Sequence, residues 1–241
     1  MNLIGKVKIT GEISTETGLH IGGSKSAIDI GGVDLNVVKT PFGEPFIPGS
    51  SHKGKLRSML ARKEGSVAVA PGKGVKEGEK TDEDVPIIIE IFGSSGDSKM
   101  KGAVTRLYVR DAFLNTEKFN EKFEDAKDSM EMEYSDVKWE NSVDRKTGAA
   151  KDPRQMERVP AGAIFKFEII YDVYNDGKKD EHLKSVCVAM RMLEDDYLGG
   201  QGSRGYGKIK YLNVKFVEFS LDYYAGNTKE GTELTAYKIE S

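Results

Sequence analysis

The chain has 241 residues, of which 38% are hydrophobic, enough to form a substantial core within one elaborated domain. Its single cysteine, Cys187, excludes an intramolecular disulfide and a zinc site built from cysteines, and it suits a reducing compartment. The formal net charge of −3 argues against unspecific polyanion binding. No apolar run approaches the about 20 residues of a membrane span and no signal-peptide pattern is present, so we expect a cytoplasmic protein without membrane contact.

Alternating apolar residues predict a first strand at 5–13, where Val7, Ile9 and Ile13 alternate with polar residues. A basic helix follows at 48–63, with Ser50 or Ser51 as its expected N-cap. Further strands are expected at 104–114, 163–174 and 208–221, and an amphipathic helix at 180–197. The order βαββαβ predicts an α+β protein with a ferredoxin-like antiparallel sheet covered by two helices.

Two insertions interrupt this core. Residues 65–101 are rich in glycine and charge, contain one apolar piece, PIIIEIF, and are expected to form a mobile segment. Residues 135–162 place turn-forming residues between two potentially extended arms, which is typical of a long protruding hairpin or of an ordered loop.

The charge is distributed unevenly along the chain. Residues 39–63 carry six bases and one acid, and residues 204–215 carry four bases and no acid. Residues 116–136 instead carry eight acids and three bases. This separation fits one surface that faces nucleic acid and another that faces away from it or toward a neighbouring subunit, although ordinary charge clustering would give the same pattern.

The glycine-rich stretch GQGSRGYGK matches parts of two nucleotide-binding patterns, but it follows a helix and opens a strand, and Ile209 stands where a phosphate loop needs Ser or Thr. We reject both patterns. Glycines still allow a close approach to backbone phosphates, although a simple helix terminator is the favoured alternative. The start of the basic helix is a second candidate anion site, with capping equally compatible.

The stretch IGGVDLNVV places one carboxylate, Asp34, among glycines and apolar residues. A local turn explains such an aspartate most simply, because Asp bonds its own backbone. The alternative is a carboxylate held beside a polyanion for chemistry, and the stretch alone leaves both open.

Several sequence blocks together resemble the backbone subunit of type III-A CRISPR Csm effector complexes, within the RAMP superfamily. In chain order these blocks are TGLHIGG, GGVD, PFIPGSSHKGKLRSML, LYVRDAFL, ENSVDRKTGAAKDPRQMERVPAG and DYLGGQGSRGYGKI. The resemblance implies a single RAMP domain over residues 1–241, with a modified RRM core, a lid-like segment at 65–101 and a thumb-like hairpin at 135–162.

The resemblance also implies a function. In that family, several copies bind one CRISPR RNA head to tail, together with other Csm subunits, and cut complementary target RNA at regular intervals. The implied partners are therefore CRISPR RNA, target RNA, further copies of this chain and other Csm subunits.

The family's cleavage depends on a divalent metal and on an aspartate in the loop after the first strand, which corresponds to Asp34. The implied metal is Mg²⁺ or Mn²⁺, with Asp34 as its ligand. A lone carboxylate can recruit magnesium with help from phosphate oxygens, because this ion keeps several waters. His20 is a candidate acid, base or phosphate contact, with a structural or RNA-contacting role preferred.

Expected RNA contacts combine the two candidate anion sites. They are Ser50, Ser51, His52, Lys53, Lys55, Arg57, Gly202, Ser203, Arg204 and Lys208. Three hairpin arginines, Arg145, Arg154 and Arg158, are expected to contact RNA or a neighbouring subunit, with ion pairs to Glu140 and Glu157 as the favoured alternative. Trp139 and Tyr206 could stack on bases, although core packing is favoured for both.

Three other functions remain open at this point. A backbone subunit without cutting activity would bind RNA but not cleave it. A guide-processing nuclease of the same superfamily would rely on histidine and resist chelators. A nucleotide-binding enzyme would bind ATP, although the glycine-rich patterns occur in the wrong context for it.

Overall fold

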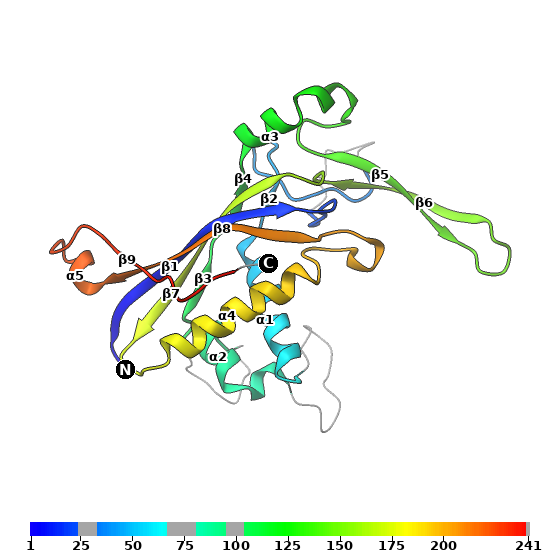
Figure 1. The fold of residues 1–241 in the computed structure, drawn as a ribbon. Helices are drawn as coiled ribbons and strands as arrows, with labels where there is room; N and C mark the ends of the chain where they lie inside the picture. Colours follow the sequence, from blue (N-terminus) through cyan, green and yellow to red (C-terminus); the bar gives the residue numbers. More distant parts are fainter. Residues whose placement is uncertain (24–32, 67–80, 95–103, 240–241) are drawn as a thin grey trace.

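The core of the computed structural model is an antiparallel sheet whose central strand, β1 (Leu3–Thr15), lies between β7 (Ile164–Tyr174) and β8 (Ile209–Ser220) (Figure 1). The structure describes residues 1–23, 33–66, 81–94 and 104–239. On the far side of β7 lie β3 (Leu107–Val109) and β4 (Ala112–Leu114). This spatial order confirms the ferredoxin-like expectation.

Apolar residues at every second position explain how the central strand is buried on one face. Val7, Ile9 and Ile13 are fully buried, whereas the intervening Lys6 and Lys8 point to the other face. The expected strand at 104–114 is instead divided into β3 and β4 at Arg110 and Asp111. Two short strands complete the sheet: β2 (Phe46–Ile47) pairs with β4, and β9 (Thr232–Glu233) pairs with β8.

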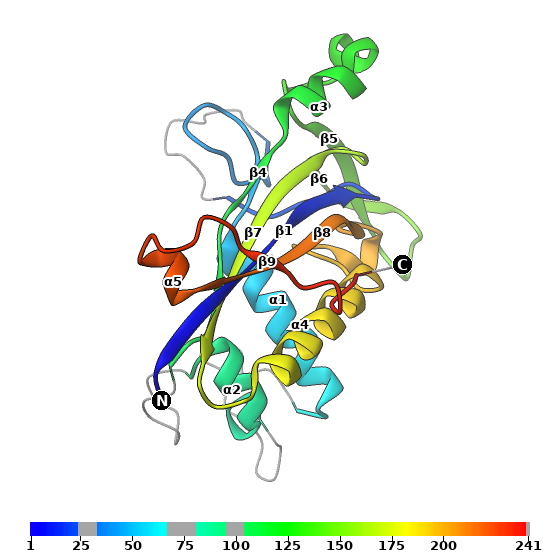
Figure 2. The same cartoon turned by 60° about the vertical axis from the view of Figure 1, so that its left-hand side comes forward.

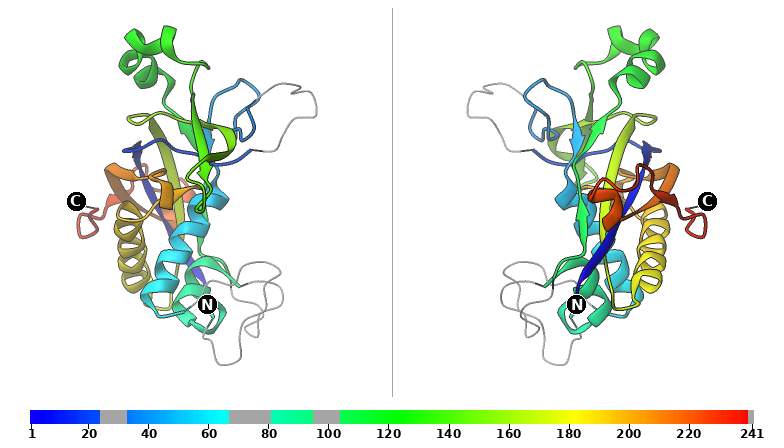
Figure 3. Two further views of the ribbon diagram at one scale, coloured as in Figure 1. Left: turned by 90° about the vertical axis from the view of Figure 1, so that its right-hand side faces the viewer. Right: turned by 90° about the vertical axis from the view of Figure 1, so that its left-hand side faces the viewer.

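Two helices, α1 (Gly49–Lys63) and α4 (Lys179–Glu194), cover the same face of the sheet (Figures 2 and 3). Both were expected, although α4 ends three residues before Tyr197. The predicted serine cap of α1 is wrong, because Pro48 occupies the N-cap position. Asp111 satisfies the first helical turn instead, since its Oδ1 accepts the Gly49 N–H at 2.7 Å.

The middle of segment 65–101 belongs to the core and is not a separate mobile piece as expected. It forms a short 3-10 helix, η1 (Asp82–Asp84), followed by α2 (Pro86–Phe92). The PIIIEIF side chains Ile88, Ile89 and Ile91 are fully buried, so they anchor this segment against the rest of the protein. Residues 67–80 and 95–101 of the expected lid lie outside the described residues.

The predicted hairpin is present. Strands β5 (Asp136–Val143) and β6 (Ala150–Arg158) pair antiparallel and project away from the core (Figure 1). The preceding acidic stretch folds into α3 (Thr116–Lys122) and a 3-10 helix, η2 (Glu124–Ser129), and β8 is followed by a short helix, α5 (Leu221–Tyr224). These three elements were not predicted. In the described part of the chain, no helix combines the length and apolarity required to cross a bilayer.

Candidate functional site

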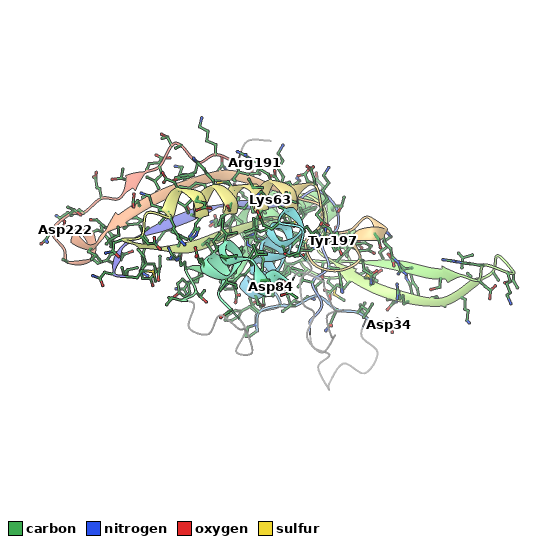
Figure 4. The ribbon with its side chains drawn as sticks, turned by 90° about the horizontal axis from the view of Figure 1, so that it is seen from below. Asp34, Lys63, Asp84, Arg191, Tyr197 and Asp222 are labelled. Atoms are coloured by element: carbon green, nitrogen blue, oxygen red, sulfur yellow. The ribbon has the colours of Figure 1, made fainter. Side chains whose placement is uncertain are left out.

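Asp34 lies on a segment that runs beside β6 at the base of the hairpin (Figure 4). The neighbouring Leu35 donates its N–H to the Gln155 carbonyl at 3.3 Å and accepts the Glu157 N–H at 2.9 Å. The Asp34 carboxylate is exposed, and its Oδ2 accepts the Gln155 N–H at 3.1 Å. The hairpin backbone therefore holds this carboxylate in place while leaving it open to solvent.

The hydrogen-bond partner of Asp34 distinguishes a local turn from a carboxylate held in place for chemistry, the two explanations that the sequence left open. Gln155 is 121 positions away along the chain, so this hydrogen bond is a tertiary contact and not a local turn. The geometry thus favours a positioned carboxylate, although the catalytic role of Asp34 remains a prediction.

His20 is 7% exposed and binds the same edge of β6. Its Nδ1 lies 2.7 Å from the Glu157 carbonyl oxygen and must donate to it, because a carbonyl can only accept. In the neutral ring, Nε2 is then the unprotonated nitrogen. Gln155 and Glu157 are two residues apart in a strand, about 7 Å, so Asp34 and His20 are anchored to neighbouring positions of β6.

The glycine-rich residues 199–207 pack directly against His20. Gly200 donates its N–H to the His20 carbonyl at 2.8 Å. Gly199 has φ of 78°, and a Cβ at this position would lie 2.3 Å from the same carbonyl oxygen. Only glycine permits both the dihedral and the approach, so the glycine-rich stretch, His20 and the hairpin base form one continuous structure.

The predicted phosphate contacts of this stretch lie on its outer side. Gly202, Ser203 and Arg204 form a short 3-10 turn, η3 (Gly202–Arg204), and Ser203 and Arg204 are exposed. Lys208 is also exposed, immediately before β8. The stretch lies between α4 and β8, which agrees with its alternative interpretation as a helix terminator. It also presents two basic side chains, Arg204 and Lys208, to solvent.

His52 does not fulfil its predicted role as an RNA contact. It is fully buried, with Nε2 2.6 Å from the Tyr211 hydroxyl and its ring edge-on to Phe167. Burial lowers the pKa of His52 to about 4, so the ring is neutral at pH 7. The prediction is wrong because His52 faces the core.

Two bases of α1 contact neighbouring segments of the protein. Arg57 donates to Asp82 Oδ2 at 2.6 Å and to the Gly93 carbonyl at 2.7 Å, and so joins α1 to η1 and α2. Lys55 lies 3.5 Å from the centre of the Tyr197 ring. These internal contacts involve two of the six bases in residues 39–63, and the partners of Arg57 contradict its assignment as an RNA contact.

Ser50, Ser51 and Lys53 are better placed for RNA. Ser50 is exposed, and Ser51 and Lys53 are half-buried at the start of α1. Burial, followed by the nearby Arg57 charge, lowers the pKa of Lys53. An incoming phosphate would counter both effects by stabilising the ammonium form.

The hairpin arginines differ in their surroundings. Arg145 is exposed in the turn that joins the two strands. Arg154 lies 3.6 Å from Glu140, and Arg158 lies 3.3 Å from Asp136. The expected pairing with Glu140 is confirmed for Arg154.

The expected pairing of Glu157 with a hairpin arginine is wrong. Its carboxylate is 1% exposed, lies 2.5 Å from Lys39 Nζ and accepts the Val37 N–H at 2.9 Å. Ser135 also donates its hydroxyl to this carboxylate. Glu157 thus ties the Asp34 segment to the hairpin, a role that no local sequence pattern indicates.

Glu140 joins the hairpin to the glycine-rich stretch. Its Oε2 accepts from Arg204 at 3.0 Å. Burial, followed by Glu140, raises the pKa of Tyr206 to about 12. Tyr206 is buried as expected, but Trp139 is 60% exposed, so the favoured core position is wrong for Trp139.

A metal at this site would depend on very few protein ligands. No cluster of three or more His, Cys, Asp or Glu side chains suited to a metal exists within the described residues. The exposed Asp34 carboxylate nevertheless fits a hard cation that is bound by one carboxylate, waters and phosphate oxygens. The donor chemistry therefore fits magnesium bound jointly by protein and RNA.

Comparisons with known proteins identify the family of this chain. The RAMP superfamily model matches residues 12–210. The chain is 42% identical over 243 residues to the CRISPR system Cms endoribonuclease Csm3 of Methanocaldococcus jannaschii, covering 100% of this chain and 92% of that protein. It is 41% identical to the protein of the same name from Streptococcus thermophilus, covering 87% and 89% of the two chains.

Solved structures show the same fold. A chain from a Csm3-Csm4 subcomplex of the type III-A CRISPR-Cas interference complex aligns with a TM-score of 0.59 and 33% identity, over 97% of this chain and 90% of that one. A chain of the type III-B Cmr-beta complex aligns with a TM-score of 0.57 and 20% identity, over 88% and 61%. This chain belongs to the RAMP superfamily and, within it, to the family of the Csm3 endoribonucleases of type III-A CRISPR systems.

Proposed function

We propose that this chain is an RNA-guided endoribonuclease subunit that also serves as the RNA-binding backbone of a type III-A complex. It binds CRISPR RNA and cuts complementary target RNA at regular intervals. The observation that carries the proposal is the exposed Asp34 carboxylate, which accepts the Gln155 N–H at the base of the hairpin. The names of the relatives support the same activity.

The RNA surface includes polar groups at the start of α1 and on the glycine-rich stretch. Ser50, Ser51 and Lys53 at the start of α1, together with Arg204 and Lys208, supply donors and positive charge. Phosphate contacts of this kind fix the register of the RNA without reading its sequence. Base pairing with the guide then selects the target.

The cleavage step needs a particular geometry of the target. Once a nucleotide leaves the stacked helix, its ribose 2′-oxygen can lie in line with the adjacent phosphorus and the leaving 5′-oxygen. The 2′-oxygen loses its proton and bonds to phosphorus, while the bond to the 5′-oxygen breaks and that oxygen gains a proton. The products are a 2′,3′-cyclic phosphate and a 5′-hydroxyl.

Asp34 acts in this reaction by holding a divalent cation, Mg²⁺ or Mn²⁺. When bound, such an ion neutralises charge on the phosphate as the reaction proceeds. Asp34 itself fixes the position of this charge relative to the hairpin, because the Gln155 N–H restrains one of its oxygens. Without a cation, the carboxylate would repel the phosphodiester.

A scaffold without cutting activity is the second candidate, because a subunit of this architecture can bind RNA in any case. The histidine-dependent guide-processing function fits less well. His52 is buried in the core, and His20 is 7% exposed with Nδ1 committed to the Glu157 carbonyl.

Cleavage of a labelled RNA complementary to a bound guide tests the proposal. Complexes are assembled with the native chain, Asp34→Ala or Asp34→Asn, in magnesium or in EDTA, and guide and target binding are measured in parallel. Glu230→Ala, at an exposed carboxylate in a distant loop, is the matched control. We expect regularly spaced cuts that disappear with either Asp34 variant and with EDTA, while binding persists.

Two results would contradict a catalytic role. Normal cutting by both Asp34 variants would assign Asp34 to structure alone. Guide and target binding without cuts by the native chain in magnesium would identify a scaffold.

A further inference from the structure

One carboxylate at the hairpin is shared by three basic side chains. Glu140 Oε2 accepts from Arg204 at 3.0 Å and lies 3.6 Å from Arg154 Nη2. Lys138 Nζ lies 3.6 Å from the other carboxylate oxygen, Oε1. Within the described residues, none of these bases pairs with a second acid. We call these four side chains the Glu140 cluster; its three positive charges and one negative charge leave a net charge of +2.

The three bases of the cluster reach solvent, whereas the acid is largely covered. The side chains of Lys138, Arg154 and Arg204 are 40%, 34% and 47% exposed. The Glu140 side chain is only 10% exposed. An anion that approaches from solvent therefore meets positive charge first, and the net charge of the cluster attracts it despite the carboxylate beneath.

The fold assembles this cluster from three segments. Glu140 of β5 pairs with Arg154 of β6 across the hairpin, and Lys138 lies two residues before Glu140 on the same face of the strand. Arg204 comes from η3 of the glycine-rich stretch. Lys138 Nζ also lies 4.8 Å from the centre of the Tyr206 ring. The bases are thus held together before any ligand arrives.

A phosphodiester is the anion that fits this arrangement. Guanidinium groups bind phosphate oxygens well, and each carries five N–H groups, so the bond from Arg204 to Glu140 does not exhaust its donors. An acidic protein segment would also match the charge. RNA is favoured because the cluster is continuous through Arg204 with the exposed Ser203 and Lys208 of the glycine-rich stretch.

We propose that the Glu140 cluster is a phosphate-binding site in which Glu140 competes with RNA for the bases. The inference rests on the proposed function, which makes the glycine-rich stretch part of the RNA surface. Glu140 keeps three long side chains ordered, but it cancels one of their charges, so the cluster neutralises two phosphates and not three. The carboxylate thereby limits the affinity of this surface for arbitrary RNA, and other contacts have to select the guide.

The expected effect of Glu140→Gln follows from this count of charges. Glutamine keeps the size and an acceptor for Arg204, but the net charge of the cluster rises by one. Each further neutralised phosphate of a single strand steepens the dependence of log affinity on log salt by about 0.7, which at about 0.1 M salt corresponds to about fivefold tighter binding. The difference should vanish near about 1 M salt. A carboxylate that served only to order the bases would have the opposite effect, because its loss would weaken binding.

Salt-dependent titration of the full chain with a labelled oligouridylate, short enough for one copy, tests the proposal by fluorescence anisotropy. The matched control is Glu168→Gln, which makes the same change of charge at an acid that lies 3.3 Å from the single base Lys8 on the open face of the sheet. Because salt screens distant charges, its affinity should stay within about twofold of the native value with the same slope. The gain from Glu140→Gln should be equal for an oligoadenylate, since phosphate contacts do not read sequence.

Arg204→Gln provides an independent test from the other side of the ion pair. Alone it should weaken binding about fivefold at about 0.1 M salt, and combined with Glu140→Gln it should restore the native slope, because the cluster then has its original net charge. Circular dichroism verifies that each variant is folded. Affinity that is unchanged or lower in Glu140→Gln, or an equal gain in Glu168→Gln, would overturn the inference. Absent RNA binding by the native chain would contradict the proposed function instead.

Discussion

Glu157 offers a direct test of how the Asp34 segment is attached to the hairpin. Its buried carboxylate binds the Lys39 ammonium at 2.5 Å and the Val37 N–H at 2.9 Å. Replacement by alanine removes these two interactions and the hydrogen bond from Ser135, and it leaves a lysine whose side chain is 28% exposed. Replacement by glutamine keeps the volume and an acceptor for the Val37 N–H but removes the charge.

The expected magnitude follows from burial. Removing one partner of a buried ion pair costs about 3–5 kcal/mol, and the partial exposure of Lys39 lets water recover part of this. We expect the free energy of unfolding to fall by about 2–4 kcal/mol in Glu157→Ala, and by about 1–2 kcal/mol in Glu157→Gln, where one neutral acceptor survives. Adding Lys39→Met to the alanine variant should cost less than the sum of the single changes.

Urea unfolding followed by circular dichroism measures these differences, and amide hydrogen exchange reports on the attachment itself. The Val37 amide should exchange faster in both Glu157 variants, because its acceptor is lost or weakened. A Glu157→Ala variant within about 0.5 kcal/mol of the native chain, or unchanged exchange at Val37, would refute this reasoning.

Three further predictions concern other parts of the molecule. The hydrogen bond from Arg106 lowers the pKa of Asp176 from 3.8 to about 2. The ionised Asp176 therefore contributes stability above about pH 4, and this contribution is lost as the pH falls toward 2. Asp176→Asn should flatten this part of the acid dependence of Tm. Trp139 is the sole tryptophan and is 60% exposed, so its emission should be that of a hydrated indole, and Trp139→Ala should change the free energy of unfolding by less than about 0.5 kcal/mol. Gly207→Ala should destabilise far more than Gly205→Ala in urea titrations, because both have positive φ but only the former places a Cβ 2.1 Å from a carbonyl oxygen. Equal losses for the two glycine variants would show that φ alone decides the cost.

The sequence was sufficient for the elements whose own residues decide their structure. Alternation predicted β1, because every second side chain of a strand faces the core. The spacing of apolar residues predicted α4, where Leu183, Val186 and Met190 are fully buried. The short helices α3 and α5 were missed because they carry little apolar periodicity, and PIIIEIF was not assigned because a short apolar run fits either a helix or a strand.

The site depended on contacts between residues far apart in the chain. The sequence alone drew attention to Asp34 and to the glycine-rich stretch, and family resemblance gave Asp34 its predicted role. It could not show that His52 faces the core, that Arg57 is bound to Asp82, or that Lys39 is paired with Glu157. The sequence does not distinguish a charged side chain that faces solvent from one that is paired inside the protein.

The sequence by itself therefore determined the ferredoxin-like order of strands and helices, since each element's own pattern of apolar residues specifies it. Tertiary structure alone decided which charges remain available and where the carboxylate is held. Asp34 is fixed by the Gln155 N–H, 121 positions along the chain, and this bond exists only because the hairpin base and the Asp34 segment pack together. Such a contact depends on how distant elements pack, and the spacing of apolar residues within each element does not predict it.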